Sequence, residues 1–307
     1  MIQYHSINNL HLQRAWVTIG IFDGVHRGHQ EILHALVSGA HAAGEPAVVL
    51  TFFPHPAVVL GGKTDFKYLA TPEERSELLG SYGVDVVITQ EFDRALADQT
   101  AVEYMDRLSQ TLDLHHLVIG YDTALGRGRE AGAARLKEIG KELGYSVQVV
   151  PALTDAAGII SSTRIRREVL AGEVSAAASD LGRPFSITGP VIHGDGRGHT
   201  INLPTANIQI PPDKVMPAFG IYACRAWVNG QPHLAATSLG VRPTFYGDNL
   251  PAPTLEAHLL DFHQDLYGKA VKLEFIEYLR PEEKYASVEA LLQQIQKDIA
   301  ATRFLVK

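Results

Sequence analysis

The sequence has only one cysteine, Cys224, so it can form neither an internal disulfide nor a zinc site built from cysteines. Because Cys224 stands in a strand-like run, we expect it to fill space in the interior. Long apolar runs are also missing, since Pro46, Pro54 and Pro56 interrupt the best candidate for a membrane span. The N-terminal residues lack the basic-then-apolar order of a signal peptide. These absences predict a cytoplasmic protein with no membrane partner.

An excess of positive charge is missing as well. Lysine and arginine number 27 against 34 acidic residues, and the formal net charge is −7. We therefore expect no nucleic acid partner bound through a broad basic surface. With 46% hydrophobic and 20% charged residues, the composition is that of an ordinary globular protein. A length of 307 residues favours two domains over one.

The first half alternates strand-like and helix-like runs. The predicted strands are Val17–Phe22, Val48–Phe53, Val84–Thr89, Leu117–Tyr121 and Val147–Pro151, and the predicted helices are Gln30–Ala43, Pro72–Ser81, Ala101–Leu112 and Ala133–Leu143. Capping boxes at Thr71 and Thr100 support two of these helices. Short apolar strands alternating with helices predict an α/β domain whose parallel sheet is covered on both faces. In such sheets ligands bind beyond the carboxyl ends of the strands.

The second half carries strand-like runs separated by glycine and proline clusters. The predicted strands are Thr188–His193, Ile221–Val228, Leu234–Leu239, Leu255–Phe262 and Val271–Tyr278. This pattern predicts a closed or nearly closed antiparallel β-barrel. A final amphipathic helix, with an apolar stripe from Val288 to Ile299, is expected to pack on the barrel. We place the domain boundary near residues 183–186, which gives domains 1–183 and 184–307.

Residues 20–29 read Gly-Ile-Phe-Asp-Gly-Val-His-Arg-Gly-His and fall where a predicted strand turns into a predicted helix. The free backbone N–H groups at a helix start bind anions, and glycines let a phosphate approach the backbone. The imidazoles of His26 and His29 can add donors or positive charge. Two alternatives stay open: an ordinary turn, or a metal site formed by Asp23, His26 and His29.

A second phosphate-binding pattern occurs at Ser161-Ser162-Thr163-Arg164-Ile165-Arg166, where hydroxyl residues precede a helix-like run. Helix capping accounts for one hydroxyl group, but not for three in a row followed by arginines. Two further segments follow predicted strands. His55, between two prolines, either points into the site or belongs to a structural turn. Asp122 precedes a glycine- and arginine-rich loop that could contact phosphate or a ring.

These motifs resemble those of a known family. HxGH at His26–His29, joined to SSTxIR at Ser161–Arg166, is similar to the nucleotidylyltransferase superfamily. The wider set GxFDGVHxGH, FxPHP and ISSTxIR resembles the FMN adenylyltransferase module of bacterial FAD synthetases. The resemblance implies a Rossmann-like α/β domain that joins AMP from ATP to FMN, giving FAD and pyrophosphate. No general base is then needed, because the FMN phosphate is already an anionic nucleophile.

The same resemblance implies roles for individual residues. His26 and His29 would contact ATP phosphates, and Asp122 would lie near adenosine. The full ATP site that it implies comprises Gly20, Phe22, Asp23, Gly24, His26, Gly28, His29, Asp122, Ser162, Thr163 and Arg166. In this set Ser162, Thr163 and Arg166 would hold the departing pyrophosphate, and His29 and Arg166 would be catalytic. His55 would contact the flavin.

The second half has its own pattern of functional residue types. A glycine-dense stretch from Gly189 to Gly198 precedes Pro204-Thr205-Ala206-Asn207. Glycine-rich loops can wrap phosphate, and the Thr205 hydroxyl and Asn207 carbonyl oxygens suit Mg²⁺. Glu256 and His258 alternate with aliphatic residues, so they share one face of a strand. Glu256 is either a functional carboxylate or part of a polar outer face.

From Gly189 to the C-terminus these motifs resemble riboflavin kinase, together with GIY at 220–222, SLGVRPT at 238–244, DLYG at 265–268 and LRPE at 279–282. The resemblance implies that Thr205 and Asn207 bind Mg²⁺–ATP and that Glu256 is the catalytic base. It also implies ATP contacts at Gly194 and Gly198, and flavin contacts at Arg242 and Arg280. The sequence departs from the family pattern at Phe53, at Thr123–Leu125, at His199 and at Asn202.

The leading hypothesis is a bifunctional enzyme that converts riboflavin to FMN and then FMN to FAD, using ATP and Mg²⁺ in both steps. One alternative is that only one half is active, and another is a flavin-binding regulator without catalysis. The expected partners are riboflavin, FMN and ATP, with transient contact to apo-flavoproteins. We expect a monomer or a weak homo-oligomer.

Overall fold

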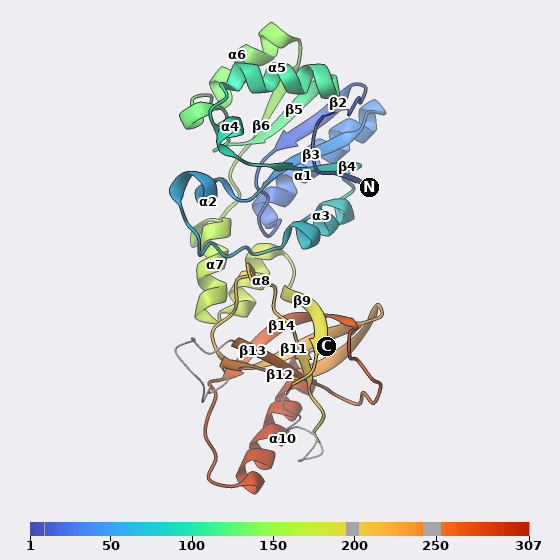
Figure 1. The fold of residues 1–307 in the computed structure, drawn as a ribbon, viewed down its shortest axis with the longest axis vertical. Coiled ribbons are helices and arrows are strands. Elements are labelled where there is room, and N and C mark those ends of the chain that lie inside the picture. The colour runs from blue at the N-terminus through green and yellow to red at the C-terminus, as the bar shows by residue number, and fades with distance from the viewer. Residues whose placement is uncertain (9, 195–202, 242–252, 307) are drawn as a thin grey trace. The chain divides into compact units, whose positions relative to one another are not determined.

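The structure is a computed structural model that describes all residues except 9, 195–202, 242–252 and 307. Its contacts divide the chain into two compact units, Met1–Ser162 and Thr163–Lys307 (Figure 1), and each is described by itself. In neither unit do the described residues include a helix that is both long and apolar enough to cross a membrane.

The first unit is built on a parallel sheet, as the alternating pattern predicts. Within its described residues, six strands pair in the order β1-β4-β3-β2-β5-β6. Their bounds are β1 Ile2–Tyr4, β2 Ala15–Ile19, β3 Ala47–Phe53, β4 Val86–Glu91, β5 Leu114–Gly120 and β6 Ser146–Val150. The edge strand β1 was not predicted, because it is short and largely exposed. A two-stranded ribbon, β7 Thr154–Asp155 and β8 Gly158–Ile159, follows the sheet.

Helices cover both faces of this sheet, which confirms the predicted layering. Their bounds are α1 Arg27–Ala43, α2 Pro56–Gly61, α3 Pro72–Ser81, α4 Arg94–Ala97, α5 Ala101–Leu112, η1 Arg127–Arg129 and α6 Ala133–Leu143. One apolar cluster joins α1 and α3 to the sheet, and a second joins α5 and α6 to it. Thr71 and Thr100 form the predicted capping boxes, and both helices begin and end at the predicted residues.

The second unit contains a closed antiparallel barrel, which confirms the prediction for this half. In the described part of the unit the strand order is β10-β13-β12-β11-β14-β9. The bounds are β9 Phe185–Ile192, β10 Ala206–Ile208, β11 Gly220–Val228, β12 Gln231–Val241, β13 Pro253–Leu259 and β14 Ala270–Arg280. Cys224 is completely buried in β11, and burial raises the pKa of its thiol to about 12.

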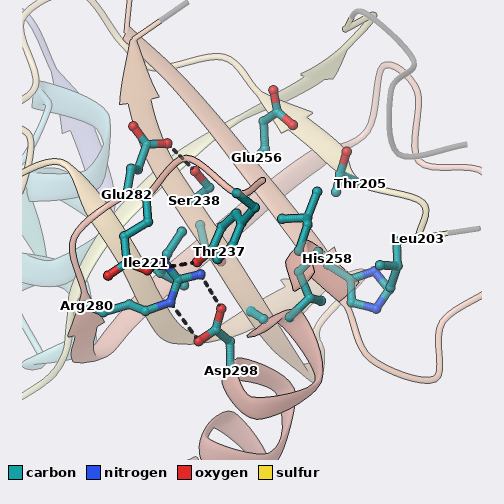
Figure 2. Close-up of a pocket in the computed structure, with 15 residues that line it drawn as sticks. Leu203, Thr205, Ile221, Thr237, Ser238, Glu256, His258, Arg280, Glu282 and Asp298 are labelled. Carbon is teal, nitrogen blue, oxygen red and sulfur yellow. Dashed lines mark hydrogen bonds and ion pairs between the residues drawn. The ribbon is translucent and has the colours of Figure 1, made fainter. Parts of the chain in front are cut away.

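In the described part of this unit, three helices accompany the barrel: α7 Ser162–Ala171, α8 Val174–Leu181 and α10 Val288–Leu305. The two units divide between Ser162 and Thr163, which is earlier in the chain than the boundary near residues 183–186 that we predicted. The helix α8 belongs to the second unit because it packs on β14 and β9. On α10, Leu291 and Ile295 line a cavity, whereas Val288 is 53% exposed and so leaves the predicted stripe. The buried residues of α10 include Asp298, which pairs with Arg280 of β14 (Figure 2).

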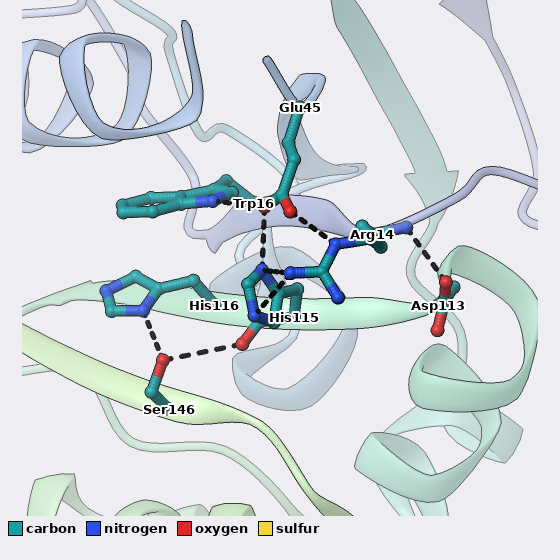
Figure 3. Close-up of polar contacts among 7 residues, drawn as sticks. All are labelled: Arg14, Trp16, Glu45, Asp113, His115, His116 and Ser146. Atoms are coloured by element: carbon teal, nitrogen blue, oxygen red, sulfur yellow. Dashed lines mark hydrogen bonds and ion pairs between the residues drawn. The ribbon is translucent and has the colours of Figure 1, made fainter. Parts of the chain in front are cut away.

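A polar cluster lies where β2, β3 and β5 begin, at the amino-terminal edge of the first sheet (Figure 3). Its centre is the Glu45 carboxylate, whose side chain is 8% exposed. It accepts hydrogen bonds from Arg14 Nε at 2.5 Å, Trp16 Nε1 at 2.7 Å and His115 Nδ1 at 2.6 Å. Burial opposes ionisation of Glu45, but the hydrogen bonds outweigh it and lower its pKa to about 2. The ring of Trp16 also stacks on His116.

The Glu45 contacts predict a pH-dependent contribution to stability. Because the pKa of Glu45 is lower in the folded state, ionised Glu45 stabilises the fold fully at pH values above its unfolded pKa of 4.5. This contribution is lost as the pH falls toward about 2. We expect Glu45→Gln to lower the unfolding temperature at pH 7 by roughly 5 °C. The difference from wild type should shrink as thermal unfolding, followed by circular dichroism, is repeated below pH 4.5. Glu138→Gln, in an exposed pair with Arg135, is the control and should change little.

Candidate functional sites

The turn after β2 leaves the sheet earlier than predicted. β2 ends at Ile19, not at Phe22, and beyond it Phe22 and Val25 adopt left-handed backbone conformations with φ of 52° and 42°. Gly24, with φ of 78°, lies between them. Left-handed conformations are rare for residues other than glycine, and especially for a β-branched residue such as Val25. Local propensity therefore does not determine this turn, and tertiary contacts must hold it.

His26 and His29 lie together where α1 begins. His26 is the N-cap residue, and its Nδ1 accepts a hydrogen bond from the backbone N–H of His29 at 3.3 Å. The two rings stack with centroids 3.6 Å apart. A ring nitrogen that accepts a hydrogen bond carries no proton itself. Histidine is not a usual N-cap residue, so α1 was predicted to begin at Gln30 rather than at Arg27.

Asp23 is buried, and its carboxylate binds neighbouring backbone. Its oxygens accept hydrogen bonds from Leu69 N at 2.9 and 3.1 Å and from Ala70 N at 3.1 Å. The Asp23 carbonyl accepts a further hydrogen bond from Ser162 Oγ at 2.8 Å. Asp23 thus joins three segments of the first unit. Across the described residues no three His, Cys, Asp or Glu side chains form a group that could hold a metal ion.

A cavity of about 420 Å³ opens at the carboxyl ends of β2, β3 and β5. Gly20, Phe22, His29 and Asp122, all predicted for the ATP site, line it. Gly24, His26 and Gly28 form the turn that leads into α1, and a Cβ on Gly28 would meet the His26 ring at 3.2 Å. The rest of the wall is mainly apolar and includes Phe52, Leu60, Phe92, Leu96 and Tyr104, together with Thr123, Ala124 and Leu125.

His55 has a local structural role in the segment after β3. Its side chain caps α2 by accepting a hydrogen bond from Ala57 N at 3.0 Å, and its ring stacks on Phe66. The following residues, Pro56 and Leu60, line the 420 Å³ cavity. The structure therefore supports the turn interpretation of His55 and leaves its flavin contact as a prediction.

The helix α7 carries the remaining residues of the first predicted site. Ser162 is the last residue of the first unit, whereas Thr163 and Arg166 belong to the second. Thr163 is exposed, and Arg166 is partly exposed. Arg164 instead binds Glu168 at 3.1 Å and Asp180 at 2.8 Å, which ties α7 to α8. Of the two arginines in the motif, Arg164 therefore has a structural function.

Strand pairing aligns the residues of the second predicted site. Glu256 of β13 pairs with Asn207 of β10 on one side and with Ser238 of β12 on the other. Ile221 of β11 and Arg280 of β14 continue this row. Side chains directly opposite one another in a ladder lie about 5 Å apart on the same face. Because Leu255 and Ala257 are buried in the barrel, the Glu256 row faces outward.

A cavity of about 310 Å³ lies over this row, and Glu256, Thr205, Ser238 and Arg280 line it (Figure 2). Ile221, Leu291 and Ile295 contribute apolar walls. The Arg280 guanidinium binds Asp298 through two hydrogen bonds of 3.0 and 2.7 Å, and these raise the pKa of Arg280. Arg280 thus fixes α10 as a wall of the cavity. Ser238 Oγ donates to Glu282 at 2.9 Å.

A second cavity of this unit, of about 450 Å³, is lined by Val191, Phe262, Tyr267 and others, and it shares Thr205 with the first. His258 Nδ1 donates to the carbonyl of Pro204 at 2.9 Å and so holds the segment before Thr205. Gly194 packs against the Asn207 amide, where a Cβ would come within 2.2 Å of Nδ2. Gly198, His199, Asn202 and Arg242 lie outside the described residues.

Sequence reasoning missed three residues that shape these sites. Arg75 of α3 is 1% exposed and donates to the carbonyls of Ile21 and Phe52, both of which line the 420 Å³ cavity. Asp298 of α10 and Ser238 of β12 were missed in the second unit. Arginine on a helix is usually exposed, so no local signal separates Arg75 from surface arginines. Asp298 could have been noticed as an acidic residue beside the apolar stripe of its helix.

The comparisons with known proteins cover nearly the whole chain. A family model described as FAD synthetase matches residues 8–164, and one described as riboflavin kinase matches residues 181–306. The bifunctional riboflavin kinase/FMN adenylyltransferase of Listeria monocytogenes is 37% identical over 290 residues, which are 94% of this chain and 91% of that protein. The protein of the same name from Escherichia coli K12 is 34% identical over 301 residues, covering 97% and 95%.

A solved structure described as a macrolide-efflux protein from Streptococcus pneumoniae superimposes with a TM-score of 0.90. It is 32% identical in sequence, and the match covers 98% of both chains. The description as a macrolide-efflux protein applies to the Streptococcus pneumoniae protein. For this chain, the match shows that both chains share the fold described above.

Of the two ion pairs that α10 forms with the barrel unit, Arg280–Asp298 and Arg303–Asp261, we expect the first to stabilise the fold more. Asp298→Asn leaves a mostly buried guanidinium without its counter-charge, so we expect a loss of about 3 kcal/mol in the free energy of unfolding. The matched control is Asp261→Asn, because Arg303 of α10 pairs with the 74% exposed Asp261. This exposed pair should contribute less than about 1 kcal/mol. Urea unfolding of both variants measures the difference, and equal losses would contradict the assignment.

Proposed function

Because the chain belongs to the bifunctional riboflavin kinase/FMN adenylyltransferase family, we infer that it phosphorylates riboflavin to FMN and then adenylylates FMN to FAD. ATP is the co-substrate of both reactions, and FMN and FAD are the products. One observation carries this conclusion: separate cavities in the two units are lined by residues from two different motif sets. We propose the division into domains 1–183 and 184–307 for the two activities.

For the kinase reaction, the 310 Å³ cavity suits riboflavin. Its apolar walls from α10 and β11 fit a flat aromatic ring, and the Glu256 carboxylate borders it. The 450 Å³ cavity suits the nucleotide, and Thr205 lines both spaces. We assign Gly194 and Gly198 to the phosphates. On this assignment the γ-phosphate and the riboflavin 5′-hydroxyl meet beside Thr205 and Glu256.

Glu256 is the proposed general base of this reaction. The 5′-hydroxyl proton moves to the Glu256 carboxylate while the hydroxyl oxygen forms a bond to the γ-phosphorus. The bond from the γ-phosphorus to the β,γ-bridging oxygen breaks, and ADP leaves. A positioned carboxylate contributes about 10²–10⁴-fold to such a step. We also propose that Arg280, and Arg242 outside the described residues, contact the flavin.

The side chains near Glu256 fit a magnesium ion bound together with ATP. The Thr205 hydroxyl and the Asn207 amide carbonyl offer hard oxygen ligands, and Gly194 leaves no side chain against Asn207. Mg²⁺ in nucleotide sites commonly takes few protein ligands and completes its shell with phosphate oxygens and water. We propose that Thr205 and Asn207 hold it. When bound, the ion neutralises phosphate charge and orients the γ-phosphoryl group.

For adenylyl transfer, we propose that FMN and ATP meet in the 420 Å³ cavity. An FMN phosphate oxygen forms a bond to the α-phosphorus of ATP, the α,β-bridging bond breaks, and pyrophosphate leaves. His29 lines the cavity and supplies an imidazole donor, while the N-terminus of α1 favours negative charge. His26 caps that terminus, and Asp122 is assigned to the adenosine side.

We assign the pyrophosphate to Ser162, Thr163 and Arg166, which lie among the first five residues of α7. The flavin part of the 420 Å³ cavity is bordered by Thr123, Ala124 and Leu125, where the family often has aromatic and basic residues. A flavin contact from His55, transient contact with apo-flavoproteins, and a monomeric or weakly associating state complete the proposal.

The Glu256 assignment predicts a selective loss of the kinase reaction. Glu256→Gln keeps the size of the side chain but removes the base, so we expect riboflavin phosphorylation to fall by about 10²–10⁴-fold. Conversion of FMN to FAD by the same sample should be unchanged. Chromatographic separation of riboflavin, FMN and FAD measures both rates. If both fall equally in a folded variant, Glu256 does not serve one site alone.

His29 should give the reciprocal result. His29→Ala removes a donor to the phosphates in the transition state, so FAD formation from FMN should fall by about 10²–10³-fold. Riboflavin phosphorylation then serves as the internal control for folding and concentration. A wild-type protein that forms only FMN, or only FAD from added FMN, would show that one half is inactive. A protein that binds flavin and forms neither product would be a regulator.

A further inference from the structure

The most unusual charged side chain in the first unit is Arg75, which lies almost wholly inside the protein on α3. Nη1 donates to the carbonyl of Ile21 at 3.0 Å, and Nη2 donates to the carbonyl of Phe52 at 3.2 Å. Ile21 follows β2, and Phe52 is near the end of the adjacent strand β3. The planar guanidinium fork therefore joins the carboxyl ends of two neighbouring parallel strands.

Both acceptors of Arg75 belong to residues that line the 420 Å³ cavity. Burial lowers the pKa of Arg75, and the charge of Asp23 opposes this effect. A buried cation is costly, and an apolar side chain of similar volume would stabilise a core as well or better. Stability alone therefore does not explain an arginine at this position. Its planar guanidinium can donate to two carbonyl oxygens at once, and no other side chain can do this in the same geometry.

The turn between β2 and α1 needs this kind of support. Strained backbone conformations such as those of Phe22 and Val25 persist only where surrounding contacts over-determine them. Thr51 Oγ1 gives the Ile21 carbonyl a second donor at 2.9 Å. Gln30 Nε2 donates to the carbonyl of Val25 at 2.9 Å. The Asp23 carboxylate fixes the middle of the turn to residues 69 and 70.

We propose that Arg75 is a positioning residue for adenylyl transfer. By holding the carbonyls of Ile21 and Phe52, it keeps the strained turn in the conformation that directs the first turn of α1 and His29 at the cavity. It acts through the turn and does not touch the substrates. This inference rests on the proposed function of the cavity as the FMN adenylylation site.

Arg75→Lys tests the proposal, because lysine keeps the charge but cannot reach both carbonyls as a fork. Displacing a reactive group by about 1 Å can cost about 10²-fold in rate. We therefore expect kcat for FAD formation, at saturating ATP and FMN, to fall about 10²-fold, with smaller changes in both KM values. Riboflavin phosphorylation by the same sample should be unchanged.

The matched control is Arg135→Lys, the same substitution at an exposed position of α6 that pairs with Glu138. Rates are compared well below the unfolding temperature of each variant, so that loss of folded protein does not contribute. If Arg75→Lys fails to fold, Thr51→Val replaces it as the test. That variant keeps the buried cation and removes only one donor to Ile21, and it should lower the same kcat by a smaller factor.

Three outcomes would overturn the proposal. One is a folded Arg75→Lys variant whose kcat for FAD formation equals that of Arg135→Lys. If Arg75→Lys does not fold, the same result for Thr51→Val counts in its place. Another is a loss that follows the unfolded fraction and disappears on cooling, which would show a role in stability alone. The third is a fall in riboflavin phosphorylation equal to the fall in FAD formation. A wild-type protein that makes FMN but no FAD would instead contradict the proposed function of the cavity.

Discussion

Backbone pairing between antiparallel strands decides which side chains meet on the outside of the barrel. Asn207, Glu256 and Ser238 lie directly opposite one another because β10, β13 and β12 pair in a single register. The row continues to Arg280, whose ion pair with Asp298 attaches α10 to it. A slip of one residue between β13 and its neighbours would turn Glu256 into the barrel and Ala257 out of it. The same hydrogen bonds that close the barrel therefore place the proposed base beside the proposed phosphate ligands.

The sheet of the first unit positions its functional residues in another way. Parallel strands bring their carboxyl ends to one edge, but they leave the turns beyond that edge without ladder partners. Here hydrogen bonds from side chains hold the backbone of the turn in place of strand pairing. Arg75 and Thr51 donate to the carbonyl of Ile21, and Asp23 accepts from the backbone at residues 69 and 70. The arrangement allows left-handed conformations at Phe22 and Val25 that no ladder would impose. One site thus depends on backbone register and the other on a few buried side chains.

The type and order of the longer elements could be predicted because they follow from local patterns. The helices after Thr71 and Thr100 begin and end where predicted, since capping boxes mark their starts. β10 was missed because a strand of three residues is too short for its alternation to stand out in the sequence. The early end of β2 and the His26 cap were missed because tertiary contacts, not local propensity, set them. The neighbours of Glu256 depend on register, which no single strand encodes, and the burial of Arg75 contradicts the usual preference of arginine for the surface.

The hydrogen bond from the Trp16 indole to Glu45 has a practical consequence. The sequence contains two tryptophans, and Trp227 lies in β11 of the barrel. Each unit therefore carries one tryptophan. Replacing either tryptophan by phenylalanine would leave tryptophan emission from a single unit, so that substrate binding and denaturation could be followed in one half of the enzyme at a time.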